Sequence, residues 1–274
     1  MHYYKVRDIA DTLKDSFNYL KTNGKNLLRI WLLFAAPLIL LHHFLLSKLP
    51  IANILEQFES EILLGFNGLD AISTMIGPLL PLIILTAILG QATSIVIIIE
   101  HINYTKDSIP MNPEDISSLL PKILGLSVLY FIISMILGLS LLFFFFPFLF
   151  VGTKLAVTFQ SYIIGEKSLI NSLIQSWNIT TYQAWPTFGL LIILILLTIM
   201  ISSLIQIPVE FIRLGLERVA WMASDLGEFI FTLINGLFNV LNAFTTIVFH
   251  TVLSFHFFNL KTRYLSDIST MNTQ

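Results

Sequence analysis

The sequence predicts an all-α fold, a polytopic transmembrane helical bundle of six spans with amphipathic helices on the membrane surface. Three observations favour this class. The 274-residue chain is 55% hydrophobic and 12% charged, and that charged fraction is about half of what soluble domains carry. Four apolar stretches exceed the roughly 18 residues that cross a bilayer. Further apolar stretches are interrupted only by Pro, Gly or single polar residues.

Composition also excludes several classes of function. The net charge of −2 does not indicate a class of partner, but nothing in the sequence resembles a basic nucleic-acid surface, so we expect no nucleic-acid partner. The lack of Cys excludes disulfides, Cys-ligated zinc and a thiol nucleophile. About 25 mostly polar residues precede the first apolar run, so we expect no cleavable signal peptide. The partners we expect are the lipid bilayer and, as a second class, another membrane or cytoplasmic protein. We expect no cofactor.

Residues 1–26 are predicted to form a cytoplasmic amphipathic helix. Over residues 4–25, apolar side chains recur at steps of three and four, and Asn23-Gly24 is a pair that ends helices. The apolar positions are Val6, Ile9, Leu13, Phe17 and Leu20. Such a helix lies either in the headgroup region of the membrane or against the loops of its own protein.

The transmembrane domain is predicted over residues 27–260, followed by a cytoplasmic tail at 261–274. Its six spans are expected at residues 27–49, 76–104, 123–142, 147–164, 185–208 and 228–260. The adjacent pair His42-His43 interrupts the first span. Two adjacent side chains do not share one helix face, so no metal site is expected there.

Several connections are predicted to have structure of their own. Residues 50–75 suggest a short helix that dips into the outer interface. Asn112-Pro113 begins a short helix that ends at Leu120, because Asn is a good N-cap and Pro suits the first helical position. Spans three and four meet in a tight turn around residues 141–147, and Gly165 ends the fourth span in a left-handed cap.

A second amphipathic helix is predicted over residues 168–181, between spans four and five. Its apolar face is formed by Leu169, Ile170, Leu173, Ile174 and Trp177. We expect it to lie on the membrane surface. The candidate interfacial contacts, with lipid or with a protein partner, are Phe17, Leu173 and Trp177. Residues 209–225 repeat the amphipathic pattern after the fifth span.

The distribution of Lys and Arg predicts the orientation, because cytoplasmic loops carry an excess of both. With the N-terminus inside, eleven of the 15 Lys and Arg residues lie in cytoplasmic segments, three lie outside and Lys154 lies within the membrane. The three outside are Lys48, Arg213 and Arg218. The sequence therefore predicts six spans with both termini in the cytoplasm.

One charge falls inside a predicted span. A lysine at the bilayer centre costs about 2.5–3.5 kcal/mol on insertion scales, so it indicates a partner or a function. Lys154 lies near mid-depth of the fourth span, and Glu100 is the only acidic residue deep in another span. We expect Lys154 to meet either Glu100 or the polar face of the sixth span.

That polar face is a stripe of side chains spaced by three or four residues. The stripe residues in the candidate intramembrane site are Asn235, Asn239, Asn242, Thr246 and His250. Two interpretations stay open. Asn and Thr at this spacing serve as hydrogen-bonding contacts between helices, or they line a polar cavity.

Signals of an enzyme are weak. Glu100 and His101 diverge on a helix and do not form an acid–base pair. The chain holds no zinc-protease, nucleophile-elbow or phosphate-loop motif. We expect neither a catalytic nor a metal-binding residue.

The run "FQSYIIGEKSLINSLIQSWNITTYQAWPTFG" resembles the bacterial glycerophosphoryl diester phosphodiesterase membrane-domain family, in a Bacteroidetes-type branch. Gly165-Glu166, Ser176-Trp177, Trp185 and Phe188-Gly189 stand at the family's motif positions. In the closing motif, Phe255, Phe257, Phe258, Asn259 and Leu260 match, whereas Lys261 departs from it. The resemblance implies six spans and an inner-membrane location. The catalytic barrel that gives the family its name is not among these 274 residues, which six spans already occupy.

Two functions follow as hypotheses. The first is a non-enzymatic scaffold, or a subunit of a membrane complex, in envelope and membrane homeostasis. The alternative is a transporter or a lipid-handling protein with a polar intramembrane cavity around Lys154. A cavity that reaches Lys154 would favour the second hypothesis.

Overall fold

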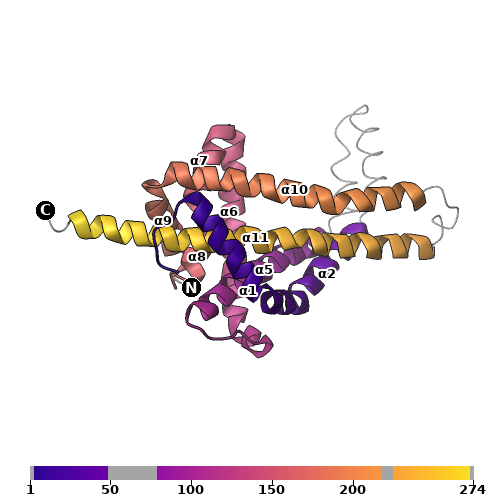
Figure 1. The fold of residues 1–274 in the computed structure, drawn as a ribbon. Coiled ribbons are helices and arrows are strands. Elements are labelled where there is room, and N and C mark those ends of the chain that lie inside the picture. The colour runs from indigo at the N-terminus through magenta and orange to yellow at the C-terminus, as the bar shows by residue number, and fades with distance from the viewer. Residues whose placement is uncertain (1–2, 49–78, 217–224, 272–274) are drawn as a thin grey trace.

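The computed structural model describes residues 3–48, 79–216 and 225–271, and over these residues it contains helices and no strands. Figure 1 shows their arrangement. The helices are α1 (Ile9–Phe34), α2 (Ala36–Ser47), α5 (Leu80–Lys106), η1 (Pro113–Leu119), α6 (Leu120–Phe143), α7 (Phe145–Leu155), α8 (Thr158–Ile163), α9 (Leu169–Thr181), α10 (Ala184–Leu216) and α11 (Asp225–Met271). The short helix predicted within residues 50–75 lies outside the described residues.

The predicted end of the N-terminal helix at Asn23-Gly24 is wrong. Helix α1 begins at Ile9 after the N-cap Asp8 and continues through both residues to Phe34. A Gly inside a helix costs about 1 kcal/mol relative to Ala. The turns that follow bury side chains such as Trp31 completely, and that burial outweighs so small a penalty. The first predicted span is therefore the second half of α1 joined to α2, with a bend of 44° between them.

Four of the described helices are long and apolar enough to cross a membrane, and the bent α1–α2 pair would be a fifth. The four are α5, η1 with α6, α10 and α11. The predicted fourth span differs, because its residues form two short helices, α7 and α8, interrupted at Ala156 and Val157. The protein is thus an all-helical membrane protein, and the six-span topology is not established by these helices.

The two longest helices, α10 and α11, run side by side in opposite directions (Figure 1). Helix α11 has 47 residues, a length of about 70 Å at 1.5 Å per residue, so it projects well beyond a hydrocarbon core of about 30 Å. The residues predicted as a polar tail continue this helix to Met271. The fifth span is predicted to end at Pro208, and the helix that contains it, α10, continues through that residue to Leu216. Helices α6 and α7 cross this pair instead of running parallel to it (Figure 1).

The main core lies where α1, α5 and the C-terminal half of α11 meet. Of the most apolar window of α5, 61% is buried, against 11% for α10. The buried face of α11 is aromatic, with Phe255, Phe257 and Phe258 all at 0% exposure. Helix α5 is therefore the central helix of the fold, and α10 has most of its surface outside the core.

Three shorter predictions have clear outcomes. The tight turn between spans three and four is confirmed, with Phe144 at a φ of 137° between α6 and α7. A helix does begin after Asn112, whose N–H donates to the Asp115 carboxylate at 2.7 Å, although it is a 3₁₀ helix. The left-handed cap at Gly165 is wrong, because Glu166 takes the positive φ of 51°. At Gly165 the backbone instead passes close to the preceding turn, because a Cβ there would lie 2.4 Å from the Ser161 carbonyl oxygen.

Candidate functional site

Lys154 is buried, with 5% of its surface exposed, at the end of α7. Its ammonium donates a hydrogen bond to the Thr181 hydroxyl at 3.1 Å. The ammonium also lies 5.4 Å from the ring centre of Phe150 and 5.8 Å from that of Trp177. A cation over aromatic faces is stabilised by the ring quadrupoles, so the charge of Lys154 is accommodated without a carboxylate.

The main chain at Lys154 explains why α9 lies against this position. Helix α7 ends at Leu155, and the last carbonyls of a helix lack partners within it. The Lys154 carbonyl accepts hydrogen bonds from the hydroxyls of Ser176, at 2.8 Å, and Thr180, at 3.2 Å. The polar face of α9 thus caps α7, and its position brings Thr181 and Trp177 to the lysine side chain.

The two partners predicted for Lys154 are both wrong. Glu100, 1% exposed, pairs with the Lys122 ammonium, which comes from the start of α6. No residue of the α11 stripe donates to or accepts from Lys154, and no carboxylate in the described part of the chain lies within ion-pair distance of it. The ammonium lies beside Thr181, three residues before α10 begins. It therefore lies near the N-terminal end of α10.

A cavity of about 370 Å³ reaches Lys154 from the side of α10. We call it the Lys154 groove. Its lining residues are Phe146, Leu149, Phe150, Thr153, Lys154, Ala184, Trp185 and Phe188. The groove is open to the surface, where Phe146 and Trp185 are each 83% exposed. It is apolar except for Thr153 and Lys154, so it presents one positive charge at the end of an apolar groove.

The predicted stripe on α11 is divided between helix contacts and a separate small cavity. The Asn239 amide donates to His43 Nδ1 of α2 at 3.1 Å and to the Asn235 carbonyl at 2.9 Å. Asn235, Asn239 and Asn242 also line a cavity of about 180 Å³ with Gln206 and Glu210 of α10. None of these residues reaches Lys154, so the stripe and the lysine do not form one site.

The inner part of the stripe is packed against aromatic rings. His250, 7% exposed, lies with its ring 6.0 Å from that of Phe159 and 5.4 Å from that of Phe249. Its Nδ1 is buried without a hydrogen-bond partner in the described part of the chain, as is the Asn242 side-chain oxygen. Thr246 is half-buried between these positions. This part of the stripe therefore resembles helix packing more than a channel.

The three predicted interfacial residues separate in the same way. Phe17 and Trp177 are 47% and 40% exposed, whereas Leu173 is half-buried and packs on the cluster of Leu129 and Ile133. Leu173 was therefore wrongly assigned to the outer surface. The outer face of α9 is formed by Ile170, Ile174 and Trp177.

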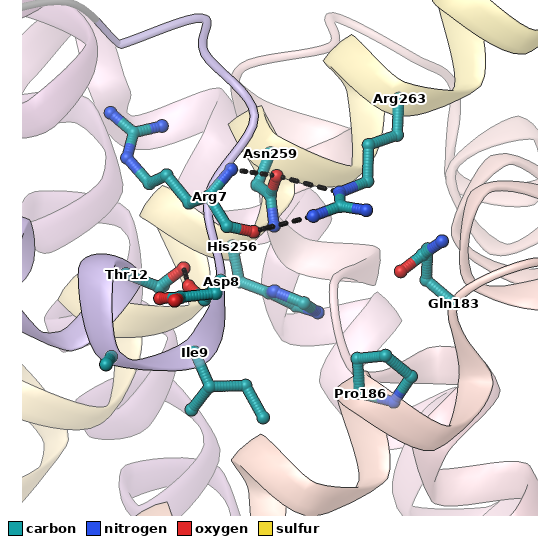
Figure 2. A pocket seen from close by; sticks show the side chains of 10 residues that line it. Arg7, Asp8, Ile9, Thr12, Gln183, Pro186, His256, Asn259 and Arg263 are labelled. Atoms are coloured by element: carbon teal, nitrogen blue, oxygen red, sulfur yellow. Dashed lines mark hydrogen bonds between the residues drawn. The ribbon is translucent and has the colours of Figure 1, made fainter.

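The sequence did not indicate a polar cluster that joins the N-terminal residues to α11. Residues 3–8, which we call the N-terminal clasp, lie along the C-terminal half of α11 (Figure 2). The Arg7 N–H donates to the Asn259 side-chain oxygen at 2.9 Å, and the Asn259 amide donates back to the Arg7 carbonyl at 3.0 Å. The Arg263 guanidinium donates to the same carbonyl at 2.9 Å. One asparagine therefore satisfies both main-chain groups of a buried residue.

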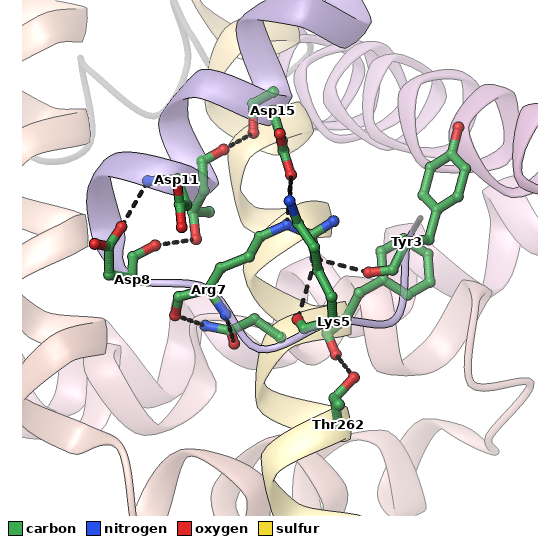
Figure 3. Close-up of polar contacts among 11 residues, drawn as sticks. Tyr3, Lys5, Arg7, Asp8, Asp11, Asp15 and Thr262 are labelled. Atoms are coloured by element: carbon green, nitrogen blue, oxygen red, sulfur yellow. Dashed lines mark hydrogen bonds and ion pairs between the residues drawn. The ribbon is translucent and has the colours of Figure 1, made fainter. Parts of the chain in front are cut away.

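The Arg7 side chain closes the clasp from the other side (Figure 3). Its Nε donates to the Asp15 carboxylate at 2.8 Å and its Nη1 donates to the Tyr3 carbonyl at 2.7 Å. The guanidinium carbon lies 5.4 Å from the ring centre of Phe255, on which Tyr3 also stacks. The signal for this cluster was present in the closing motif, where Asn259 stands among aromatic residues. Nothing in the spacing indicated that its partner is residue 7.

The fold and these sites define a helical, multi-pass membrane protein with a charged groove on one side. Comparison with protein-family models, with curated proteins and with solved structures finds no match to the chain. The resemblance to the phosphodiesterase membrane-domain family stays a prediction.

Proposed function

We propose that this protein is a non-enzymatic lipid-handling protein of the bacterial inner membrane, which binds the headgroup of an anionic lipid at Lys154. One observation carries the proposal: a buried lysine without a carboxylate partner in the described part of the chain borders an apolar groove that opens to the surface. Of the two hypotheses from the sequence, this favours lipid handling over a scaffold.

The chemistry of the lysine supports a phosphate ligand. An ammonium has three N–H donors, and the hydrogen bond to Thr181 uses one of them. The remaining donors suit a phosphate oxygen, to which lysine binds as a point charge. A bound anion would also offset the cost of holding an unpaired charge in apolar surroundings.

The groove supports an acyl chain in the same molecule. Phe146, Leu149 and Phe150 follow one face of α7 away from the lysine, and Trp185 and Phe188 face them from α10. A lipid with its phosphate at Lys154 would place a chain between these side chains. The arrangement of one charge at one end and apolar walls beyond it matches an amphiphile and not a soluble ion.

The membrane placement belongs to the same proposal. We place both termini in the cytoplasm, on the eleven-to-three distribution of Lys and Arg, with α7 and α8 as a broken fourth span among six. The exposed apolar face of α9 would then rest on the cytoplasmic leaflet, as amphipathic helices do. Lys154 would lie at the depth of the headgroups of that leaflet.

Quenching of tryptophan fluorescence tests the proposal. The full-length protein is placed in nanodiscs of phosphatidylcholine that contain increasing fractions of phosphatidylglycerol with brominated acyl chains. Brominated lipid in the groove quenches the fluorescence of Trp185. The contribution of Trp185 to the total quenching is the part that is lost in the Trp185→Phe variant. We expect Lys154→Met to weaken the apparent affinity for phosphatidylglycerol about tenfold, which corresponds to the loss of one charge-assisted contact.

The matched control is Lys261→Met. The Lys261 ammonium also lies over aromatic rings, 5.8 Å from that of Tyr4 and 6.0 Å from that of Phe257, but it does not line the groove. We expect this variant to quench like the wild type. Equal quenching by brominated phosphatidylcholine, or an unchanged affinity in Lys154→Met, would overturn the proposal.

A further inference from the structure

A second pocket lies on the other side of the first turn of α10, between that turn, the start of α1 and the C-terminal half of α11. It has a volume of about 440 Å³, and it is lined by residues of all three elements. Figure 2 shows Arg263, Gln183 and His256 around its centre. We propose that this Arg263 pocket binds a phosphate group that carries a proton, at the cytoplasmic face of the membrane.

Arg263 supplies the positive charge. Its guanidinium is held in place by two hydrogen bonds, one to the Arg7 carbonyl at 2.9 Å and one to the Asn259 side-chain oxygen at 3.2 Å. A guanidinium has five N–H donors in a fixed planar fork, so these bonds orient the fork and leave donors for a ligand. Gln183, across the pocket, has a half-buried side chain without a hydrogen bond to any described residue. Its amide adds a further donor.

His256 supplies an acceptor, and the neighbouring bonds determine its tautomer. The Thr187 hydroxyl donates its proton to the Gln183 carbonyl at 2.7 Å. The 2.9 Å contact between Thr187 and His256 Nε2 therefore has the ring nitrogen as its donor. The proton of the neutral ring then resides on Nε2, which leaves Nδ1 as an acceptor. The ring is 2% exposed and lines the pocket.

Donors beside an acceptor select among anions. Phosphate keeps a proton near neutral pH, so its oxygens can accept from Arg263 while its P–OH donates to His256 Nδ1. Sulfate has no proton to donate, and it would leave this nitrogen facing a lone pair, which is unfavourable in a buried site. The pocket therefore fits phosphate better than sulfate.

Asp8 strengthens the same selection. Its carboxylate caps α1 by accepting the Asp11 N–H at 2.6 Å, and the residue lines the pocket. A negative charge there repels a fully ionised anion and tolerates one that carries a proton. Asn is as good an N-cap as Asp. Asp8→Asn thus removes the repulsion without removing the cap.

The phosphate could belong to a soluble compound or to a lipid headgroup, since both carry the same group. Equilibrium binding of radiolabelled inorganic phosphate to the full-length protein, in phosphatidylcholine nanodiscs, tests the shared chemistry. We expect saturable binding in the wild type, weakened at least tenfold by Arg263→Gln and several-fold by Gln183→Leu. Sulfate should compete poorly with the wild type and at least tenfold better with Asp8→Asn.

A second arm distinguishes the two sources. Phosphatidic acid, whose headgroup is a phosphate monoester, is added to the nanodiscs. Displacement of the label assigns the site to a lipid headgroup, and retention of the label assigns it to a soluble phosphate. Both results support the pocket as a phosphate site.

Two controls keep the result interpretable. Arg263→Gln also removes a clasp contact, so Gln183→Leu, which breaks no hydrogen bond of the fold, must weaken binding in the same direction. Lys261→Met changes a lysine that lines neither cavity, so it must leave phosphate binding unchanged. The lipid proposal is measured by phosphatidylglycerol quenching and this one by labelled inorganic phosphate, so the two can fail separately. Absence of saturable binding, binding that survives both pocket variants, or equal affinity for sulfate in the wild type would overturn the inference.

Discussion

Arg7 and Lys154 are both buried cations, at 1% and 5% exposure, and they differ in how completely their donors are used. Arg7 donates to the Asp15 carboxylate and to two main-chain carbonyls, and it lies over the ring of Phe255. Lys154 donates to one hydroxyl and borders an open groove. The first charge completes the fold, and the second has donors left for a ligand.

A buried cation is structural or functional according to how many of its donors are left without a protein partner. Desolvating a cation is costly wherever it occurs, so burial alone does not distinguish a structural from a functional one. The informative quantity is the number of donors left over beside a cavity. By that measure Arg7 belongs to the clasp, and Lys154 and Arg263 belong to candidate sites.

The largest effect that tests this contrast is expected for Arg7→Met. The change removes the ion pair between Arg7 and Asp15 and leaves the one between Lys5 and Asp15, at 2.9 Å. The Tyr3 carbonyl loses the guanidinium as a donor and keeps the Lys5 N–H, at 3.2 Å. Loss of one partner of a buried pair costs about 3 kcal/mol. We expect that loss in the free energy of unfolding, measured by denaturant titration in mixed micelles.

The matched control for this prediction is Lys5→Met. Lys5 pairs with the same carboxylate, but its side chain is 44% exposed, and exposed pairs contribute less than about 1 kcal/mol. If the two variants lost equal stability, Arg7 would not be the residue that holds the clasp, and its contrast with Lys154 would fail.

A smaller loss is expected for Asn259→Leu, which keeps the volume of the side chain and removes both of its hydrogen bonds to residue 7. The Arg7 carbonyl keeps Arg263 as a donor, whereas the Arg7 N–H loses the Asn259 side-chain oxygen as an acceptor. Removal of the acceptor of a buried donor costs about 2 kcal/mol. The same denaturant titration measures it, with the exposed Asn178 changed to Leu as a control that should stay within about 0.5 kcal/mol.

The sequence predicted the helices well where periodicity and burial agree. The turn at Phe144 and the helix start after Asn112 were visible because local residues determine them. The predicted helix end at Asn23-Gly24 is wrong. A Gly within a helix is a local signal worth about 1 kcal/mol, and the burial of side chains such as Trp31 along α1 outweighs it.

The sites were less predictable, because partners depend on how helices are arranged in three dimensions. Lys154 was correctly singled out as a charge in apolar sequence, but Glu100 is paired with Lys122 of the neighbouring helix instead. The clasp joins residues 252 positions apart, a pairing that periodicity does not encode. A charge in an apolar stretch thus indicates a candidate site, and the arrangement of the helices determines which charges have partners.

The α11 stripe supplies the last test of the same principle, at a buried polar group that has no ligand site beside it. His250 Nδ1 is buried between aromatic rings without a partner among the described residues, and such a group is unfavourable relative to an apolar one of similar size. We expect His250→Leu to raise the free energy of unfolding by about 1 kcal/mol, read from the same titration, and to leave phosphatidylglycerol binding at Lys154 unchanged. Ser254→Ala is the control, because the Ser254 hydroxyl donates to the His250 carbonyl within the same helix at 2.7 Å and its loss should cost up to about 1 kcal/mol. A destabilised His250→Leu variant would instead mean that the imidazole holds a hydrogen-bonded partner in the membrane, and the stripe would then be a polar cavity lining, as the second interpretation of the sequence had it.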